Sequence, residues 1–233
     1  MLITFEGIDG SGKTTTSLAL QRKLIERGIA ARWYARSSSD YPNDYIRRKM
    51  RLFRQVLWPA RTSEQNLFGP RFSVLALAAW FTVMNENRLR HIAPNEVVIV
   101  ESWFYRLITK LACQGESEPW LLSLFSHIRQ PDLIVFLDVD PAVCWQRRKG
   151  FKPFEIGRWA NIDGERAQAY MVFQSRVRQR LLDVARERDW RIVAPGGNVT
   201  PNVIASRLAR VVAARHPAPP TEERHAHAAV VAG

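Results

Sequence analysis

Cysteine is scarce in this sequence, and long apolar runs are absent from it. Only Cys113 and Cys144 occur among 233 residues, and neither lies in a CxxC or Cys/His pattern. This excludes a disulfide framework and a cysteine-based metal site, and we expect two reduced thiols in a cytoplasmic protein. No apolar run approaches the length that spans a bilayer. The first ten residues, MLITFEGIDG, read as the start of a strand, so we expect no secretory signal.

Acidic residues are also fewer than basic ones. The chain has 34 Lys and Arg against 22 Asp and Glu, a formal net charge of +12. Such a balance suits a nucleic-acid partner or phosphorylated small molecules, although an arginine-rich proteome would give the same number. Because the arginines are dispersed along the chain, charge alone does not indicate DNA binding, and we do not expect nucleic acid as the partner.

Apolar segments alternate with helical ones along the chain. We expect strands at 2–6, 29–35, 97–100, 133–140 and 190–194, and helices at 14–27, 45–57, 71–92, 103–113, 119–129, 142–148, 163–188 and 201–215. The central strands are apolar throughout, which is typical of a parallel sheet covered on both faces. The pattern predicts one α/β domain over 1–215. Residues 216–233 are rich in Pro and Ala without periodicity and are expected to be a disordered tail.

The most specific motif lies between the first strand and the first helix. Residues 7–14 read GIDGSGKT, which fills every fixed position of the GxxxxGK[ST] phosphate loop. In this motif glycines turn backbone N–H groups toward the phosphates, Lys13 supplies a cation and Thr14 a hydroxyl for Mg²⁺. The motif predicts binding of a magnesium nucleotide, ATP, by Gly7, Gly10, Ser11, Gly12, Lys13, Thr14 and Thr15.

Two stretches resemble the thymidylate kinase family. The phosphate loop and its flanks read FEGIDGSGKTT at 5–15, with the family's acidic residue at Asp9. Residues 131–141, PDLIVFLDVDP, are similar to a second family motif, and arginines follow it where the family has its lid. The resemblance covers most of residues 1–212 and is weak between these motifs.

The resemblance implies a P-loop kinase fold with a five-stranded parallel sheet, helices on both faces and a mobile lid at about 147–162. It also implies transfer of the ATP γ-phosphate to dTMP, and a homodimer, which is common in the family. By family analogy Asp9 lies near the acceptor sugar or the transferring phosphate. Because the phosphate loop carries no arginine, the lid is expected to supply the cation that stabilises the transferring group. The candidates are Arg147, Arg148, Lys152 and Arg158, of which the three arginines are expected to be catalytic.

The acceptor side departs from the family pattern. The family's Asp-Arg-Tyr after the third strand is Glu101-Ser102-Trp103 here, so the acid is kept as Glu101 and the phosphate-binding arginine is missing. Glu101 at a strand end is a candidate for catalysis and, with Thr14, for binding Mg²⁺. The expected acceptor-binding residues are Asp9, Arg36, Trp80, Arg88 and Gln114. Trp80, Phe81, Trp103 and Tyr105 are candidates for stacking on a base, although aromatic residues on apolar helices more often belong to the core.

These departures leave several functions open. The first is a nucleoside monophosphate kinase acting on dTMP or a related nucleotide. The second is a kinase of the same fold that acts on another nucleoside or small metabolite, which the missing arginine favours. An ATP-binding protein without transferase activity and a nucleic-acid-bound ATPase are further alternatives. The intact loop argues against the former, and the short chain leaves little room for the DNA-binding module of the latter.

Overall fold

The structure is a computed structural model that describes residues 1–59, 67–148, 150–196 and 199–215. The expected tail at 216–233 lies outside the described residues. None of the described helices combines the length and apolar character that a membrane span requires.

A five-stranded parallel sheet forms the centre of the molecule, as expected from the sequence. Its strands lie in the order β2-β3-β1-β4-β5, with β1 Leu2–Glu6, β2 Ala30–Tyr34, β3 Glu96–Val100, β4 Leu133–Leu137 and β5 Arg191–Val193. β1 pairs with β3 on one side (Ile3 opposite Ile99) and with β4 on the other (Phe5 opposite Val135). β1 is buried throughout, and β3 and β4 are buried after their first residue, which explains why these strands are mainly apolar. Since all five strands run the same way, their carboxyl ends meet at one edge of the sheet.

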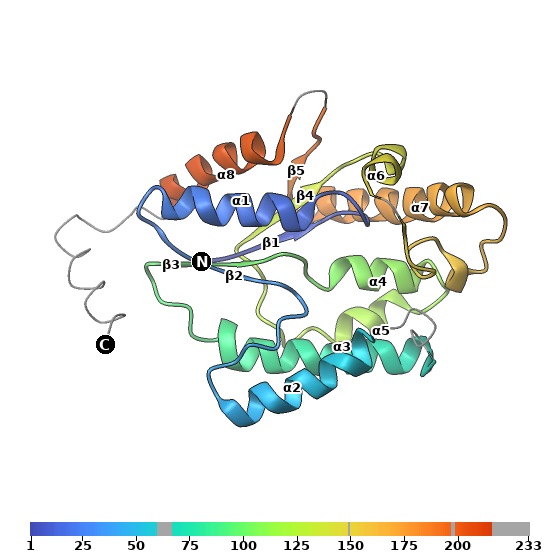
Figure 1. Cartoon of the computed structure of the whole chain (residues 1–233), viewed down its shortest axis with the longest axis horizontal. Coiled ribbons are helices and arrows are strands. Elements are labelled where there is room, and N and C mark those ends of the chain that lie inside the picture. Colours follow the sequence, from blue (N-terminus) through green and yellow to red (C-terminus); the bar gives the residue numbers. More distant parts are fainter. Residues whose placement is uncertain (60–66, 149, 197–198, 216–233) are drawn as a thin grey trace.

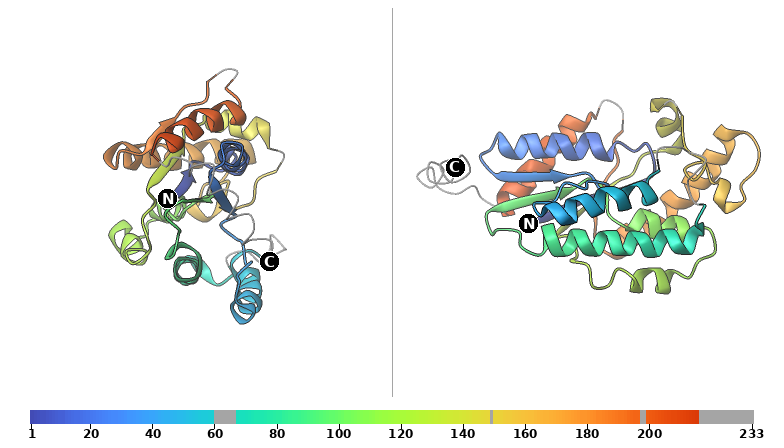
Figure 2. Two further views of the ribbon diagram at one scale, coloured as in Figure 1. Left: turned by 90° about the vertical axis from the view of Figure 1, so that its left-hand side faces the viewer. Right: turned by 60° about the horizontal axis from the view of Figure 1, so that its bottom comes forward.

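Helices cover both faces of the sheet (Figure 1). α1 (Lys13–Ile25) packs against α8 (Pro201–Arg215) on one face. On the other lie α3 (Gly69–Met84), α4 (Tyr105–Ala112) and α5 (Glu118–Ser123), and α2 (Asp44–Leu57) packs outside α3. Figure 2 shows the same two layers from the side. α6 (Pro141–Arg147) and α4 both contact the long α7 (Arg166–Glu187).

Two expected helices end earlier than their apolar patterns indicated. The segment predicted at 71–92 is α-helical only from Gly69 to Met84 and continues as a π-helical turn, Asn85–Leu89. There the Asn87 amide donates to the carbonyl of Val83 (2.8 Å), and the Asn85 side chain accepts from the N–H of Arg129 (3.0 Å). α5 stops at Ser123, whose hydroxyl donates to the carbonyl of Trp120 (2.7 Å). In both places short polar side chains compete with the helical backbone bonds.

The segment expected to be the lid follows α6 and packs down onto α7. It contains a short 3₁₀ turn, Arg158–Ala160, and two buried apolar side chains, Phe151 and Ile156. The Phe151 ring stacks on Trp145 (5.3 Å between centroids) and lies 4.2 Å from the Tyr170 ring. The segment therefore lies beside the phosphate loop and α4, at the edge where the strands end.

Candidate active site

The loop between β1 and α1 has the backbone of a phosphate cradle. Gly7, Gly10 and Gly12 all have positive φ angles, of 146°, 86° and 88°. A Cβ atom at Gly7 would lie 2.8 Å from the carbonyl oxygen of Leu137, and one at Gly10 would lie 3.1 Å from Cβ of Cys144. Gly12 precedes α1 and leaves the helix without a side-chain cap. The first N–H groups of α1 are thus left to bind an anion.

Lys13 is folded back over this loop. Its ammonium group donates to the carbonyls of Gly7 (2.9 Å) and Ile8 (2.6 Å) and to the Ser11 hydroxyl (3.2 Å). Burial, reinforced by the nearby charge of Arg106, lowers the pKa of Lys13 to about 7. An arriving phosphate would add negative charge beside the amine and favour its protonated form.

Thr14 and Glu101 come together at the start of α1. The Thr14 hydroxyl donates to Oε2 of Glu101 at 2.7 Å, and Oε1 accepts from the N–H of Arg36 at 3.3 Å. A hydroxyl and one carboxylate are hard oxygen donors of the kind that binds Mg²⁺ together with substrate phosphates. Within the described ranges no group of three His, Cys, Asp or Glu residues is arranged as a metal cage. The donor set therefore fits a magnesium ion that arrives with a nucleotide.

Asp9 lies at the centre of a buried charge cluster. Its carboxylate forms ion pairs with Arg106 and Lys110 and accepts from the Gln174 amide at 3.1 Å. The Tyr170 hydroxyl donates to its backbone carbonyl at 2.6 Å. Burial alone would raise the pKa of Asp9, but the charges of Arg106, Lys110 and Lys13 outweigh it and hold that pKa well below its usual range. Asp9 is therefore ionised and fixed in place at neutral pH.

One large cavity joins the phosphate loop to the end of α6. Its cavity volume is about 980 Å³. It is lined by residues 9–16, Arg36, Glu101, Arg106, Arg147, Arg148 and Glu155, together with Pro195, Val199, Thr200, Pro201 and Ile204. Arg148 forms an ion pair with Glu155 at 3.0 Å and covers the Phe151 ring. Arg147 and Arg148 thus face the same space as the phosphate loop.

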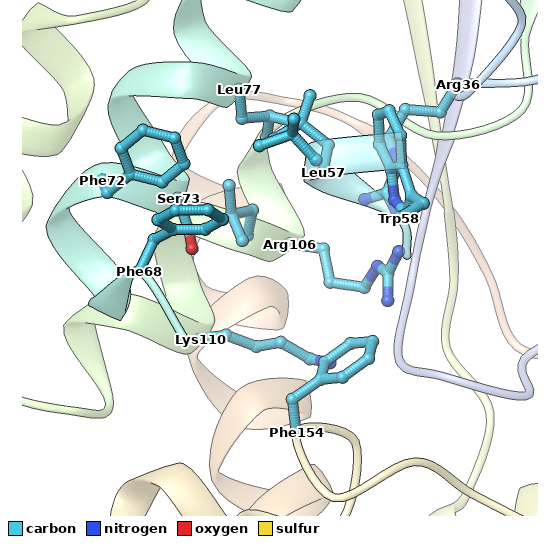
Figure 3. Close-up of a pocket in the computed structure, with 12 residues that line it drawn as sticks. Arg36, Leu57, Trp58, Phe68, Phe72, Ser73, Leu77, Arg106, Lys110 and Phe154 are labelled. Carbon is cyan, nitrogen blue, oxygen red and sulfur yellow. The ribbon is translucent and has the colours of Figure 1, made fainter. Parts of the chain in front are cut away.

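A second, smaller cavity lies between α2, α3 and α4 (Figure 3). Its cavity volume is about 120 Å³. One end is apolar, with Leu57, Phe68, Phe72 and Leu77; the other carries Arg36, Arg106 and Lys110, beside Trp58 and the lid residue Phe154. Arg36 and Arg106 also line the large cavity, so the two spaces meet at these guanidinium groups.

Comparison with known proteins agrees with this geometry. The sequence profile of the thymidylate kinase family matches residues 5–201. The chain belongs to the thymidylate kinase family. It is 26% identical over 221 residues to a thymidylate kinase of Chlorobium limicola, covering 93% of this chain and 96% of that protein. It is also 26% identical over 149 residues to a protein of Staphylothermus marinus named "Probable thymidylate kinase", covering 64% of this chain and 68% of the relative.

Solved thymidylate kinase structures share the fold. The enzyme of Candida albicans superposes with a TM-score of 0.65 at 20% identity, covering 92% of this chain and 91% of that one. The thymidylate kinase of Ehrlichia chaffeensis superposes with a TM-score of 0.61 at 22% identity, covering 91% of this chain and 97% of that one. The expected five-stranded P-loop kinase fold is confirmed.

The arginine that the thymidylate kinase pattern places after β3 is missing here, and Arg106, the second residue of α4, lies at the site. Glu101-Ser102-Trp103 lacks that arginine, but Arg106 reaches Asp9 and lines both cavities. Sequence reasoning missed Arg106 and Lys110. The feature of the sequence that could have revealed them is their spacing of four residues on a short apolar helix. Two positive side chains at this spacing lie on the same helix face and repel each other unless an anion lies between them.

Three of the expected acceptor residues are placed elsewhere. Trp80 is fully buried among Tyr41, Met50 and other apolar side chains, and its indole N–H donates to the carbonyl of Arg36 at 2.9 Å, so it cannot stack on a base. Arg88 is buried against the Tyr41 ring and donates to the carbonyls of Ser38 and Asp40. Gln114 lies beyond the end of α4, outside the residues that line either cavity. Only Asp9 and Arg36 of that set lie at the site.

The lid candidates separate into two groups. Arg147 and Arg148 line the phosphate cavity. Arg158 instead donates to the carbonyls of Ile162 (3.0 Å) and Gly164 (2.7 Å), so it braces the lid backbone. It is not among the residues that line the phosphate cavity, so its catalytic role stays a prediction that the structure does not favour.

Proposed function

We propose that this chain transfers the γ-phosphoryl group of ATP, with Mg²⁺, to dTMP or a closely related nucleoside monophosphate. The observation that carries the proposal is the junction of the two cavities. Arg36 and Arg106 line both the space above the phosphate loop and the smaller aromatic pocket. A donor phosphate and an acceptor phosphate bound on the two sides would therefore meet at these guanidinium groups.

Each residue has a role in this arrangement. The donor phosphates are bound by the backbone N–H groups of residues 10–14 and by the ammonium group of Lys13. Arg147 and Arg148 neutralise the charge that develops on the transferring group, which is the main demand of phosphoryl transfer. Thr14 and Glu101 are the residues that would hold Mg²⁺, which when bound neutralises phosphate charge and orients the oxygens.

The acceptor pocket suits a nucleotide with a charged phosphate. Its cationic end supplies fixed positive charge; burial and the neighbouring Arg106 lower the pKa of Arg36 to about 10, which leaves it protonated at neutral pH. The opposite end offers Phe68, Phe72 and Leu77 to the flat face of a base. Asp9 holds Arg106 in position between the two phosphates.

The proposal is tested by ADP release from Mg·ATP in the presence of dTMP, dUMP, dCMP, thymidine, deoxycytidine or no acceptor. We expect fast release with dTMP, slower release with at least one related monophosphate, and only background hydrolysis with the nucleosides. Equal release with and without every monophosphate would contradict it.

We also propose that two copies associate through the outer face of α2 and α3. Tyr45 and Leu52 on α2 and Leu75 on α3 are 62%, 59% and 50% exposed, which is unusual for large apolar side chains. The two helices pack together, and the exposed side chains of Arg48, Lys49 and Arg51 lie between Tyr45 and Leu52 in the sequence of α2. A second copy covering this face would bury the apolar side chains, in keeping with the homodimer that the family resemblance implies.

A cytoplasmic location completes the proposal. The chain uses ATP in this account, and both of its cysteines are free thiols in the described residues. Both features suit a reducing compartment that supplies the nucleotide.

A further inference from the structure

Lys110 is an unusual residue for the position that it occupies. It lies one helical turn after Arg106 on α4, and both side chains are buried, with 4% and 8% of their surface exposed. Each pairs with a different oxygen of the Asp9 carboxylate. Two buried cations on one helix face repel each other, and burial itself disfavours the charged form of a lysine. The arrangement therefore calls for more negative charge than Asp9 alone provides.

The ion pairs at the cationic end of the acceptor pocket show the same imbalance. Arg36, Arg106 and Lys110 line the pocket there. Asp9 is the one carboxylate of the described residues that forms an ion pair with any of them. Glu6 lies behind the cluster, where burial raises its pKa and favours its neutral form. Glu101 and Glu155 also lie near these cations, but Glu101 is hydrogen-bonded to Thr14 and Glu155 is paired with Arg148. The three cations thus share one directly paired carboxylate, and a phosphomonoester, which carries about two negative charges near neutral pH, would pair with them.

The lid helps to fix the Lys110 side chain. Its ammonium group lies 4.7 Å from the centroid of the Phe154 ring and 5.9 Å from that of Phe173. Phe154 belongs to the lid and lines the same pocket (Figure 3). These rings hold the Lys110 ammonium group in a buried position. Because the side chain is already ordered, it loses less conformational entropy when it binds an anion.

Building on the proposed function, we propose that the Lys110 ammonium group binds the phosphate of the acceptor nucleotide. In the free protein Asp9 holds this cation; when the acceptor enters, the phosphate oxygens share Lys110 and Arg106 with Asp9. Lys110 thereby adds, together with Arg106, to the phosphate recognition that the sequence after β3 lacks.

The test compares dTMP with thymidine, which differ only in the phosphate. Calorimetric dissociation constants are measured for both ligands on the wild-type full chain and on Lys110→Met, which keeps the apolar stem. A charge-assisted hydrogen bond predicts that the preference for dTMP over thymidine falls about 10- to 100-fold in the variant. The affinity for thymidine should change less than about threefold, since its sugar and base contacts remain.

Matched variants separate binding from structure. Lys110→Arg should keep part of the dTMP preference, and Lys23→Met, on the remote face of α1, should keep all of it. If Lys110→Met does not fold, Lys110→Gln replaces it, because glutamine retains a donor for Asp9 without the charge. Melting temperatures of all variants are measured alongside.

Two results would overturn the assignment of Lys110. One is an equal loss of affinity for dTMP and thymidine, which indicates a structural role; the other is an unchanged preference. Both differ from failure of the proposed function itself, in which the wild-type protein neither prefers dTMP over thymidine nor phosphorylates it.

Discussion

Lys13 carries a pH dependence that can be measured in the nucleotide-binding step. Because burial and Arg106 lower its pKa to about 7, most of the amine is neutral at pH 8 in the free protein. Bound phosphate favours the ammonium form, so ATP binding at pH 8 should take up close to one proton, and much less at pH 6, where the amine is already charged. Calorimetric titrations in buffers of different ionisation enthalpy measure this uptake directly.

Lys13→Arg is the matched control, because a guanidinium stays charged throughout this range. The Lys13→Arg variant should take up few protons when it binds ATP at pH 8. An uptake in the wild-type protein that is the same at pH 6 and pH 8 would mean that the Lys13 pKa is not lowered.

The same buried amine affects stability in a defined direction. Its pKa is lower in the folded protein than the ordinary value of 10.5. The cost of burying its charged form is therefore fully present below about pH 7 and is relieved as the pH rises from about 7 toward 10.5.

Arg106 should matter mainly for the acceptor. Arg106→Met removes the guanidinium that lies between the two cavities and leaves Asp9 with Lys110 as its remaining ion-pair partner. We expect kcat/KM for dTMP to fall by at least about 10²-fold, the scale of one charged contact to a transferring phosphate.

Steady-state assays with Arg210→Met, an exposed change on α8, provide the control and should match the wild type. An Arg106→Met enzyme that keeps full activity would show that the missing family arginine has no replacement in α4.

Arg106 also shows how far residue-level reasoning from the sequence reaches. The phosphate loop could be assigned because its spacing is fixed by local backbone geometry, and Gly7, Lys13 and Thr14 lie as expected. The acceptor residues depend on how α3 and α4 pack, which local sequence does not determine. Trp80 and Arg88 were interpreted as ligand contacts, but their apolar and aromatic neighbours bury them in the core.

At the scale of single elements, the lid segment carries two arginines, Arg148 and Arg158, to which we assign different roles. Arg148 lines the phosphate cavity, whereas Arg158 bonds to lid carbonyls. Arg148→Met should lower kcat by about 10²- to 10³-fold through loss of charge on the transferring phosphoryl group. Arg158→Met should lower kcat less than about tenfold and make residues 150–165 more sensitive to limited proteolysis, because their backbone loses two donors.

Steady-state kinetics with saturating ATP and dTMP, and a time course of proteolysis, measure the two effects. The reverse pattern, a large loss of kcat in Arg158→Met and none in Arg148→Met, would contradict the assignment of the lid.

Element boundaries were predictable where a helix or strand has a strong local signal and less so elsewhere. The side chain of Asn43 accepts from the N–H of Ile46 and starts α2 at Asp44, close to the expected residue 45. α5 is shorter than its apolar pattern because serine hydroxyls take up its carbonyls. Such competition depends on rotamers that the sequence does not show.

At the scale of the whole molecule, the exposed apolar side chains of α2 and α3 lead us to predict a dimer. Leu52 is 59% exposed on the outer face of these helices, and Leu52→Glu would place a charge in the centre of the interface. Size-exclusion chromatography with light scattering should give twice the chain mass of 26.8 kDa for the wild type and the single-chain mass for the variant.

Ile25→Glu serves as control, since Ile25 is 54% exposed on α1, away from that face. It should remain dimeric. A wild-type protein that elutes at the mass of one chain over the micromolar range would contradict the proposed association.

The overall architecture followed from the sequence because three signals agreed. Uniformly apolar strands, helices between them and a phosphate loop after the first strand allow few arrangements other than a parallel P-loop sheet. The acceptor pocket did not follow, because its lining comes from α2, α3, α4 and the lid, segments that are far apart in the chain and meet only in the folded protein.

The central claim is phosphoryl transfer from ATP to a nucleoside monophosphate, and the most direct test follows the phosphate itself. The protein is incubated with ATP labelled in its γ-phosphate, Mg²⁺ and dTMP, and the labelled products are separated by chromatography. We expect the label in dTDP at a rate far above that of free phosphate release, and no transfer in Lys13→Met. Label that appears only as free phosphate, or that stays in ATP, would contradict the account.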